Sequence, residues 1–336
     1  MITFFICTIL LNLSIFFFQD KLDKFVNIYD KPDKIRKFHK GSIPLTGGVL
    51  IFINLFFFII CDFFLEKKFF FFQDFFNYNR IYYSFVFGLV SFFLLGLLDD
   101  KISISANLKL IIQILILFIV LLLDPNLKIE YIKFSFFDKK IYLNEFSLIF
   151  SILCFLLFIN AFNMFDGING QSGIYAIINF LIFYLLLDKL IFLLIIFIMV
   201  IFLCKNFKNK IFLGNSGSYL ISFLISFYYV KFYNTEIINE ADFIGLIMFI
   251  PGLDLLRLFF FRIYKGKNPF TPDRNHLHHI LLRKFNYKLS FFLLFFLIGF
   301  PLIINYFFHA IFLIIILTTF SYALLLIIIR KFKNKY

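Results

Sequence analysis

The chain has 336 residues, of which 62% are hydrophobic and 60 are phenylalanine, and its mean hydropathy is +0.94. A soluble domain could not bury this much apolar surface, so the composition excludes a soluble protein and indicates a polytopic membrane protein. A formal net charge of +13 would favour nucleic acid as the partner of a soluble protein, but here we assign it to cationic loops that orient helices in a membrane, and we expect no nucleic acid partner.

Apolar segments of membrane-spanning length follow one another along the whole chain. Because about 20 apolar residues cross a bilayer, the sequence predicts an all-α polytopic membrane protein with 10–11 transmembrane helices in a single domain, residues 1–336. The expected spans are 1–18, 43–64, 80–98, 107–123, 146–161, 172–187, 190–204, 212–230, 241–261, 289–305 and 309–329. No basic region precedes the first span and no small-residue cleavage site follows it, so we expect it to be retained. The alternating segment 128–143 predicts a small external β-hairpin.

Lysine and arginine are distributed unevenly among the connections. Most of the 33 basic residues follow odd-numbered spans or lie in the C-terminal tail. Since cytoplasmic loops carry the excess of cationic residues, the N-terminus is predicted to be external and the tail cytoplasmic. Five unusual polar clusters then share the cytoplasmic side, and we interpret them as one site. They are 30–48, 96–101, 160–173, 213–218 and 254–279.

Acidic and carboxamide side chains dominate the middle clusters. Asp99 and Asp100 stand at the inner end of the third span, where a carboxylate is costly unless it is solvated, paired or metal-bound. The stretch "NAFNMFDGINGQSG" supplies further oxygen donors, namely Asn160, Asn163, Asp166 and Asn169. Such ligands suit Mg²⁺, with Mn²⁺ as an alternative, far better than zinc. A solvated helix end and a polar turn that caps two helices are the structural alternatives.

The last cluster is cationic and rich in histidine. Its members are Arg257, Arg262, Lys265, Lys267, Arg274, His276, His278 and His279. Guanidinium groups bind phosphate in bidentate fashion, and imidazoles donate hydrogen bonds to phosphate oxygens. A zinc site is disfavoured because no acidic or thiol partner lies within the usual spacing. Oxygen ligands for a divalent cation, together with cationic groups for phosphates, indicate phosphoryl transfer at a membrane surface.

The motifs "DKPDKIRKFHKGSIPLTGG", "LLGLLDD", "NAFNMFDGINGQSG" and "PFTPDRNHLHH" occur in an order that resembles the polyprenyl-phosphate N-acetylhexosamine-1-phosphate transferases, or glycosyltransferase family 4. The resemblance covers about residues 30–282. It implies that a UDP-N-acetylhexosamine, most readily UDP-N-acetylglucosamine, reacts with undecaprenyl phosphate and releases UMP. It also implies a multi-pass protein of the bacterial inner membrane that starts a lipid-linked cell-surface polysaccharide such as O-antigen. A homodimer is left open.

The same resemblance assigns roles to individual residues. Asp99 is implied as the base or orienter of the lipid phosphate, Asp100 supports it, and Asp166 lies near the nucleotide. Asn163 and Asn215 are implied at the metal. The implied substrate-binding residues are Lys40, Asn160, Asn169, Arg257, Arg274, His276, His278 and His279.

Two positions depart from the family pattern. The family usually has aspartate where this chain has Asn215, and often where it has Asn169. Asparagine keeps an oxygen ligand and loses a charge, so we expect weaker metal binding. The alternatives left open are the same reaction with another UDP-linked N-acetyl deoxyamino sugar, a catalytically inactive relative, and a transporter or lipid-handling protein.

Overall fold

The computed structural model describes residues 2–32, 41–64, 79–267 and 275–331. Each of the eleven predicted spans coincides with a helix, and the predicted hairpin is present. Within the described ranges, six helices are long and apolar enough to cross a membrane. Four shorter apolar helices accompany them, and large apolar side chains such as Leu185 (73% exposed), Tyr306 (75%) and Phe320 (72%) face outward. The protein is therefore an all-α polytopic membrane protein, as predicted.

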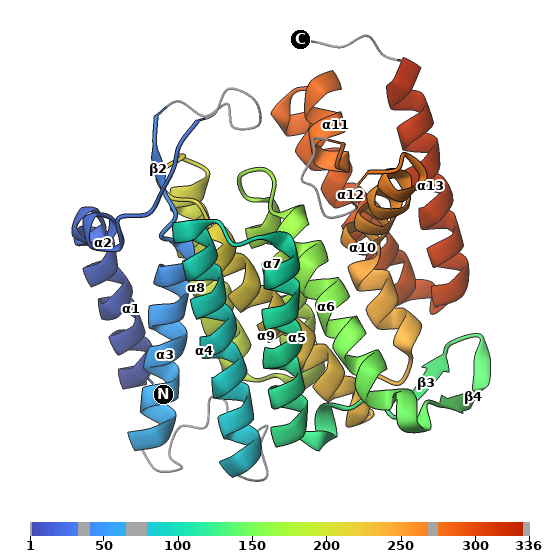
Figure 1. Ribbon diagram of the computed structural model, residues 1–336, viewed down its shortest axis with the longest axis horizontal. Coiled ribbons are helices and arrows are strands. Elements are labelled where there is room, and N and C mark those ends of the chain that lie inside the picture. Colours follow the sequence, from blue (N-terminus) through green and yellow to red (C-terminus); the bar gives the residue numbers. More distant parts are fainter. Residues whose placement is uncertain (1, 33–40, 65–78, 268–274, 332–336) are drawn as a thin grey trace. The chain divides into compact units, whose positions relative to one another are not determined.

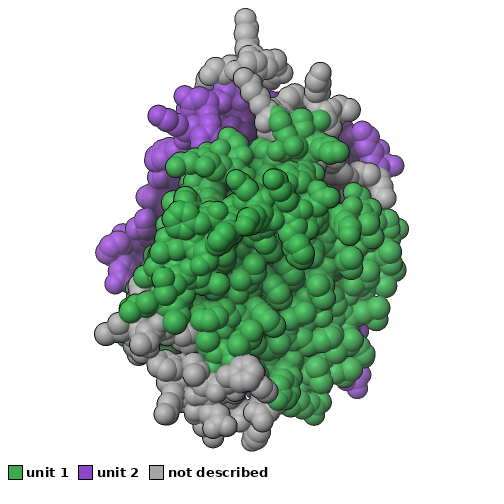
Figure 2. Space-filling model, turned by 90° about the vertical axis from the view of Figure 1, so that its left-hand side faces the viewer, with its two compact units in different colours: residues 1–125, 169–227 green, residues 126–168, 228–336 purple. Residues whose placement is uncertain are grey.

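The chain divides into two compact units (Figure 2), residues 1–125 with 169–227 and residues 126–168 with 228–336. The prediction of a single domain stays a prediction.

The first unit consists of long helices that run side by side (Figure 1). They are α1 (Ile2–Phe17), α3 (Gly47–Phe64), α4 (Asn79–Ile102), α5 (Ala106–Leu123), α7 (Gln171–Leu187), α8 (Leu190–Asn206) and most of α9 (Gly214–Asn234). Aromatic packing joins α4 to α9, because the Phe92 and Phe223 rings stack with centroids 5.0 Å apart. Gly88 leaves room for this contact, since a Cβ there would lie 2.3 Å from the Phe223 ring.

Two short elements of the first unit lie outside the predicted spans. The amphipathic helix α2 (Gln19–Val26) follows α1, and strands β1 (Tyr29–Asp30) and β2 (Ile43–Pro44) pair antiparallel. The polar face of α2 is buried through Asp23, whose Oδ1 accepts hydrogen bonds from Gln19 Nε2 at 2.7 Å and Thr46 Oγ1 at 2.7 Å. Lys205 Nζ of α8 donates to Gln19 Oε1 at 2.7 Å. These hydrogen bonds therefore fix α2 to the start of α3 and the end of α8.

The second unit contains four long helices and the hairpin. Its elements are β3 (Tyr131–Phe134), β4 (Phe137–Tyr142), α6 (Ser147–Phe165), α10 (Ala241–Tyr264), α11 (Leu277–Lys284), α12 (Tyr287–Phe308) and α13 (Ile311–Lys331), with the short 3₁₀ turns η2 (Pro125–Leu127) and η3 (Asn144–Phe146) nearby. Helix α10 packs on α6, α12 and α13, so it is the centre of this unit.

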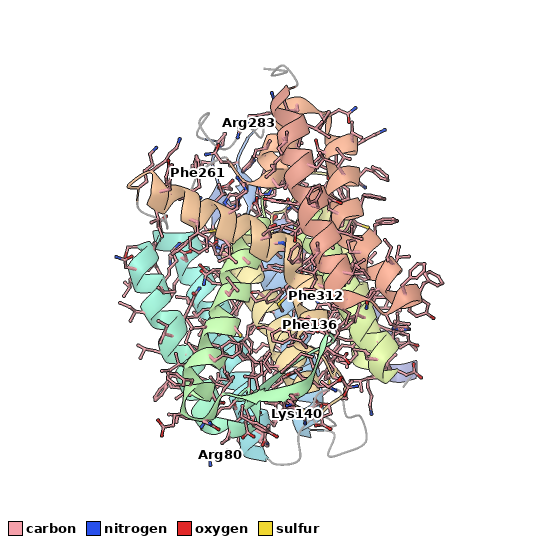
Figure 3. All side chains as sticks on the ribbon, turned by 90° about the vertical axis from the view of Figure 1, so that its right-hand side faces the viewer. Arg80, Phe136, Lys140, Phe261, Arg283 and Phe312 are labelled. Atoms are coloured by element: carbon pink, nitrogen blue, oxygen red, sulfur yellow. The ribbon has the colours of Figure 1, made fainter. Side chains whose placement is uncertain are left out.

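The hairpin is held to the helices by polar and aromatic contacts. The Ser135 N–H donates to both carboxylate oxygens of Asp242, the second residue of α10, at 3.0 and 3.1 Å. The rings of Phe136 and Phe312 pack with centroids 4.4 Å apart (Figure 3). Lys140 forms an ion pair with Glu236 at 2.9 Å and lowers the pKa of that carboxyl. The hairpin is therefore anchored to the α9–α10 connection and to the start of α13.

Candidate functional site

Asp99 lies in the last turn of α4 and is almost completely buried. Lys109 Nζ donates to its Oδ2 at 2.8 Å, and the N–H of Ile104 donates to its Oδ1 at 2.9 Å. A buried carboxylate needs such partners, because an unpaired charge at a helix end in a membrane protein is costly. The carboxylate therefore connects the end of α4 to the first turns of α5.

Asp100 caps another helix. Its Oδ1 accepts from the Asn215 N–H at 2.8 Å, and its Oδ2 accepts from the Ser216 N–H at 3.0 Å. Both donors lie in the first turn of α9, where backbone N–H groups have no partner within the helix. A negative charge at this end also interacts favourably with the helix dipole. Asp100 thus fixes the start of α9, including Asn215, against α4.

Glycines allow these backbones to approach. A Cβ on Gly96 would lie 2.4 Å from the carbonyl oxygen of Asn215, so any larger residue would force α4 and α9 apart. Gly214 has a φ of +72°, and a Cβ there would lie 2.6 Å from Asp100 Oδ2. Both the left-handed backbone and the close carboxylate require glycine at position 214.

The start of α3 joins the same region. The N–H groups of Gly47 and Gly48 donate to the carbonyls of Phe212 and Leu213 at 2.9 and 3.0 Å. The Phe212 N–H in turn donates to the carbonyl of Pro44 at 2.9 Å. Three of the predicted clusters, 30–48 through its residues 43–48, 96–101 and 213–218, therefore meet at one end of the first unit (Figure 1).

Asn169 belongs to the first unit and lies in the turn before α7. Its amide donates to the Asn209 carboxamide oxygen at 2.7 Å. The next residue, Gly170, has a φ of +77°, and its N–H donates to Asn206 Oδ1 at 2.6 Å. These two contacts connect the start of α7 to the end of α8.

The first part of the third motif, residues 160–168, lies in the second unit. Helix α6 ends at Phe165, so Asp166 is the residue that follows the helix. Asn160 lies in the helix, where its amide donates to the carbonyl of Leu156 at 2.8 Å. Asn163 and Asp166 are both partly buried near this helix end. A carboxamide and a carboxylate therefore lie three positions apart in sequence at the C-terminal end of α6.

The histidine motif packs directly against this helix end. A Cβ on Gly167 would lie 1.9 Å from His278 Nε2, so the imidazole occupies the space beside the backbone that follows Asp166. His278 is buried, and its ring stacks parallel to that of His276 with centroids 5.7 Å apart. The His279 ring lies 4.2 Å from that of His278. Segments more than 100 residues apart in sequence are therefore packed together in the second unit.

Burial decides the charge state of His278. It lowers the pKa of this imidazole well below the usual 6.5, and the neighbouring His279 and His276 rings lower the pKa further. A charged imidazolium loses hydration in such a place, so the neutral form is favoured. His278 is therefore neutral at physiological pH.

The buried carboxylate of Asp254 organises the start of α11. His276 Nδ1 lies 2.8 Å from Asp254 Oδ2, and the Leu277 N–H lies 3.2 Å from both oxygens. Arg257 Nη2 donates to Asp254 Oδ1 at 2.7 Å and to the carbonyl of Asn275 at 2.5 Å. The carboxylate thus satisfies the first N–H of α11 and orients the first histidine of the motif.

The predicted site residues are distributed over both units. The first unit holds Asp99, Asp100, Asn169 and Asn215. The second holds Asn160, Asn163, Asp166, Arg257, His276, His278 and His279. Lys40 and Arg274 lie outside the described residues. The individual roles assigned to these residues stay predictions.

Three residues with central contacts were not named as site residues from the sequence, although Asp254 begins the predicted cluster 254–279. A carboxylate within the apolar run 241–261 was a usable signal for Asp254, because charged residues inside spans are rare and functional. Lys109 lies near the start of an apolar span, where a snorkelling lysine is ordinary. Tyr322 in α13 gave no signal, since a single tyrosine in an apolar helix is unremarkable in composition.

The donor chemistry near the end of α6 fits a hard divalent cation. Among the residues that the structure describes, no three His, Cys, Asp or Glu side chains form a group that could hold a metal ion. Mg²⁺ does not need such a group, because it is usually bound by one or two carboxylates together with water and substrate phosphates. Asp166 and Asn163 supply one carboxylate and one carboxamide oxygen, which fits an ion that shares its coordination with a diphosphate.

Comparison with known proteins finds one family and relatives that share one name. Residues 82–233 match the model of glycosyl transferase family 4. A protein of Thermotoga maritima is 30% identical over 257 residues, which are 76% of this chain and 73% of that protein. Proteins of Escherichia coli O157:H7 and Yersinia pestis are each 28% identical, over 80% and 82% of this chain and 72% and 74% of their own lengths. All three are named undecaprenyl-phosphate alpha-N-acetylglucosaminyl 1-phosphate transferase.

Proposed function

This chain belongs to glycosyl transferase family 4 and is a sugar-phosphate transferase, and from that premise we propose that it transfers N-acetylglucosamine 1-phosphate from UDP-N-acetylglucosamine to undecaprenyl phosphate. The observation that carries the proposal is the packing of His278 against Gly167, which unites a phosphate-binding motif with a carboxylate motif in one unit. UMP is the second product, and the lipid-linked sugar starts a cell-surface polysaccharide such as O-antigen.

The reaction exchanges one phosphorus–oxygen bond for another. An oxygen of the lipid phosphate attacks the β-phosphorus of the UDP-sugar, and the bond from that phosphorus to the bridging oxygen breaks. UMP leaves with the electron pair. A phosphate monoester has a second pKa of about 6, so the nucleophile is largely dianionic at neutral pH and needs no strong base. Positioning and neutralisation of charge therefore supply most of the catalysis.

Different residues of the chain bind the donor phosphates, the lipid phosphate and the metal ion in this proposal. The imidazoles of His276 and His279 contact the donor phosphates, while neutral His278 packs against the Gly167 backbone and can donate one ring N–H. Asp99 acts on the lipid phosphate through Lys109, because the buried carboxylate holds the partly exposed ammonium that offsets charge repulsion. In the second unit, Asp166 and Asn163 would hold Mg²⁺, or Mn²⁺ in its place. By the family resemblance, Asn215 is a candidate metal ligand of the first unit. The ion, when bound, neutralises the charge of the diphosphate.

Asn215 sets the strength of metal binding in this proposal. Its side chain carries no charge where the family usually has aspartate, so an ion bound at this position would depend more on the phosphates of the substrate. Asn215→Asp should lower the Mg²⁺ concentration needed for half-maximal activity by about tenfold, because a carboxylate binds a hard cation more tightly than a carboxamide. A titration of activity with Mg²⁺ measures this, and an unchanged midpoint would contradict a role for position 215 at the metal.

The enzyme lies in the inner membrane of a bacterium with its N-terminus outside and its active site in the cytoplasm. This orientation follows from the positive-inside distribution of lysine and arginine and gives the site access to cytoplasmic UDP-sugars.

The decisive experiment measures UMP release by the purified protein with undecaprenyl phosphate, Mg²⁺ and a panel of UDP-N-acetylhexosamines. Lipid-dependent UMP with UDP-N-acetylglucosamine supports the proposal. Activity only with a deoxyamino sugar nucleotide corrects the donor. No UMP with any donor, in a folded sample that stays inactive after Asn215→Asp, overturns the proposal in favour of an inactive relative. Asp166→Asn should abolish activity, whereas Asp138→Asn on exposed β4 should not.

A further inference from the structure

A single tyrosine on the last helix completes the polar network behind the histidine motif. Tyr322 is buried in α13, 43 residues beyond His279, and outside every polar motif of the sequence. Its hydroxyl donates to Asp254 Oδ1 at 2.7 Å and accepts from Arg257 Nε at 2.8 Å. A buried hydroxyl is stable in an apolar helix only with such partners. Tyr322 therefore joins α13 to α10 through two hydrogen bonds.

These contacts hold the Asp254 carboxylate in one plane relative to the histidine. Oδ1 accepts from both Tyr322 and Arg257, so its acceptor capacity is largely used. Oδ2 remains for His276 Nδ1, at 2.8 Å. The two oxygens are chemically equivalent, so a half-turn about the Cβ–Cγ bond would restore the same contacts. A smaller rotation would break the bond to Tyr322 and turn Oδ2 away from His276. The tyrosine hydroxyl thus fixes the plane of the carboxylate and, through it, the orientation of the imidazole.

The orientation of His276 decides which ring atom can reach a ligand. When Nδ1 donates its proton to the carboxylate, Nε2 is the ring atom left for a ligand, and it donates to a phosphate oxygen when it also carries a proton. A partner behind the ring of a functional histidine holds its orientation in the same way that outer-sphere groups hold metal ligands. We propose that Tyr322 is a positioning residue of the transferase, acting through Asp254 to hold His276 and the start of α11 in the geometry that binds the donor diphosphate. The role in donor binding rests on the proposed function.

Tyr322→Phe tests this with the loss of one oxygen atom. We expect KM for the UDP-sugar to rise about fivefold and kcat/KM to fall about tenfold, because a hydrogen bond to a buried charge is lost. KM for undecaprenyl phosphate should stay unchanged. A smaller folded fraction would instead lower the apparent kcat and leave both KM values as they were. The matched control is Tyr306→Phe, a tyrosine that is 75% exposed on α12.

A double-mutant cycle shows whether the effect passes through His276. In the His276→Gln background, Tyr322→Phe should change the donor KM by less than twofold, because the group that it positions is already gone; the threshold is about the error of such cycles. Fully additive effects, or an unchanged donor KM in the single variant, would overturn the proposal.

Hydrogen exchange separates this inference from the proposed function. The Leu277 N–H donates to Asp254 in the intact network. Tyr322→Phe should therefore speed exchange in the segment 275–282, whether or not the protein turns over a substrate. If the wild type is inactive with every donor, the proposed function fails, and unchanged exchange in this segment would overturn the network as well.

Discussion

Gly167 is the residue where the carboxylate motif and the histidine motif touch. A Cβ at this position would lie 1.9 Å from His278 Nε2, which no atom can accept without displacement of the ring. Gly167→Ala should therefore reduce UMP release at least about tenfold while the helices stay folded, as for mutations that misplace catalytic groups by about 1 Å. The matched control is Gly299→Ala, since a Cβ there meets no atom within 4 Å. Equal activity of both variants would show that the contact has no role in catalysis.

His278 makes stability depend on pH in a defined direction. Because burial lowers the pKa of this imidazole well below 6.5, the unfolded chain binds a proton that the folded chain does not, once the pH falls below about 6.5. The free energy of unfolding should decrease between pH 7 and pH 5, with a slope of up to about 1.4 kcal/mol per pH unit from this group.

His278→Gln should flatten that part of the pH profile. The exposed His309, in the turn between α12 and α13, provides the control variant His309→Asn, which should leave the slope unchanged. Unfolding of the detergent-solubilised protein at several pH values measures the effect. An identical slope in wild type and His278→Gln would mean that another group causes the pH dependence.

At the scale of single elements, the hairpin has an anchor that can be removed without touching the candidate site. Asp242 receives the Ser135 backbone N–H and a further short bond from the Ser135 hydroxyl. Asp242→Ala should speed hydrogen exchange throughout 131–142, because the hairpin loses its polar tie to α10. Activity should stay within about twofold of wild type. Asp138→Ala on exposed β4 is the control, and unchanged protection in Asp242→Ala would show that the Phe136–Phe312 contact is sufficient.

The sequence predicted some helices and strands but not others. Apolar length predicted all of the long helices, and alternation predicted the hairpin, because both patterns are local. Helix α2 was missed since its eight residues are mostly polar and its stability comes from the Asp23, Thr46 and Lys205 contacts. Helix α11 was read only as a cationic motif, although Asp254 supplies the cap that starts it.

The sequence indicated candidate residues for the site, but not which residues they contact. Polar residues in apolar surroundings are conspicuous, so Asp99, Asp100 and the histidines could be named from sequence. Their partners could not be named in the same way. The pairing of Asp254 with Tyr322 joins positions 68 residues apart, and no periodicity connects them. Nothing in the sequence indicates that Asp100 accepts hydrogen bonds from two backbone N–H groups of α9.

At the scale of the whole molecule, the orientation in the membrane can be tested with single cysteines. The hairpin is predicted to be external and the turn after α8 cytoplasmic. In a variant without native cysteines, Asp138→Cys should react with a membrane-impermeant maleimide in spheroplasts. Lys208→Cys should react only after permeabilisation, since its exposed side chain follows α8. The reverse pattern would place the motif ends outside the cell and contradict a reaction with cytoplasmic UDP-sugars.

The contact of Tyr322 with Asp254 also has a consequence for biosynthesis. All polar motifs of this chain have been translated by residue 279. Tyr322, whose hydroxyl bonds to Asp254, is translated later. Until α13 inserts beside α10, the nascent protein has its histidines without their final support. Membrane insertion of the last helix would then complete the support of His276, after all of the polar motifs are already in place.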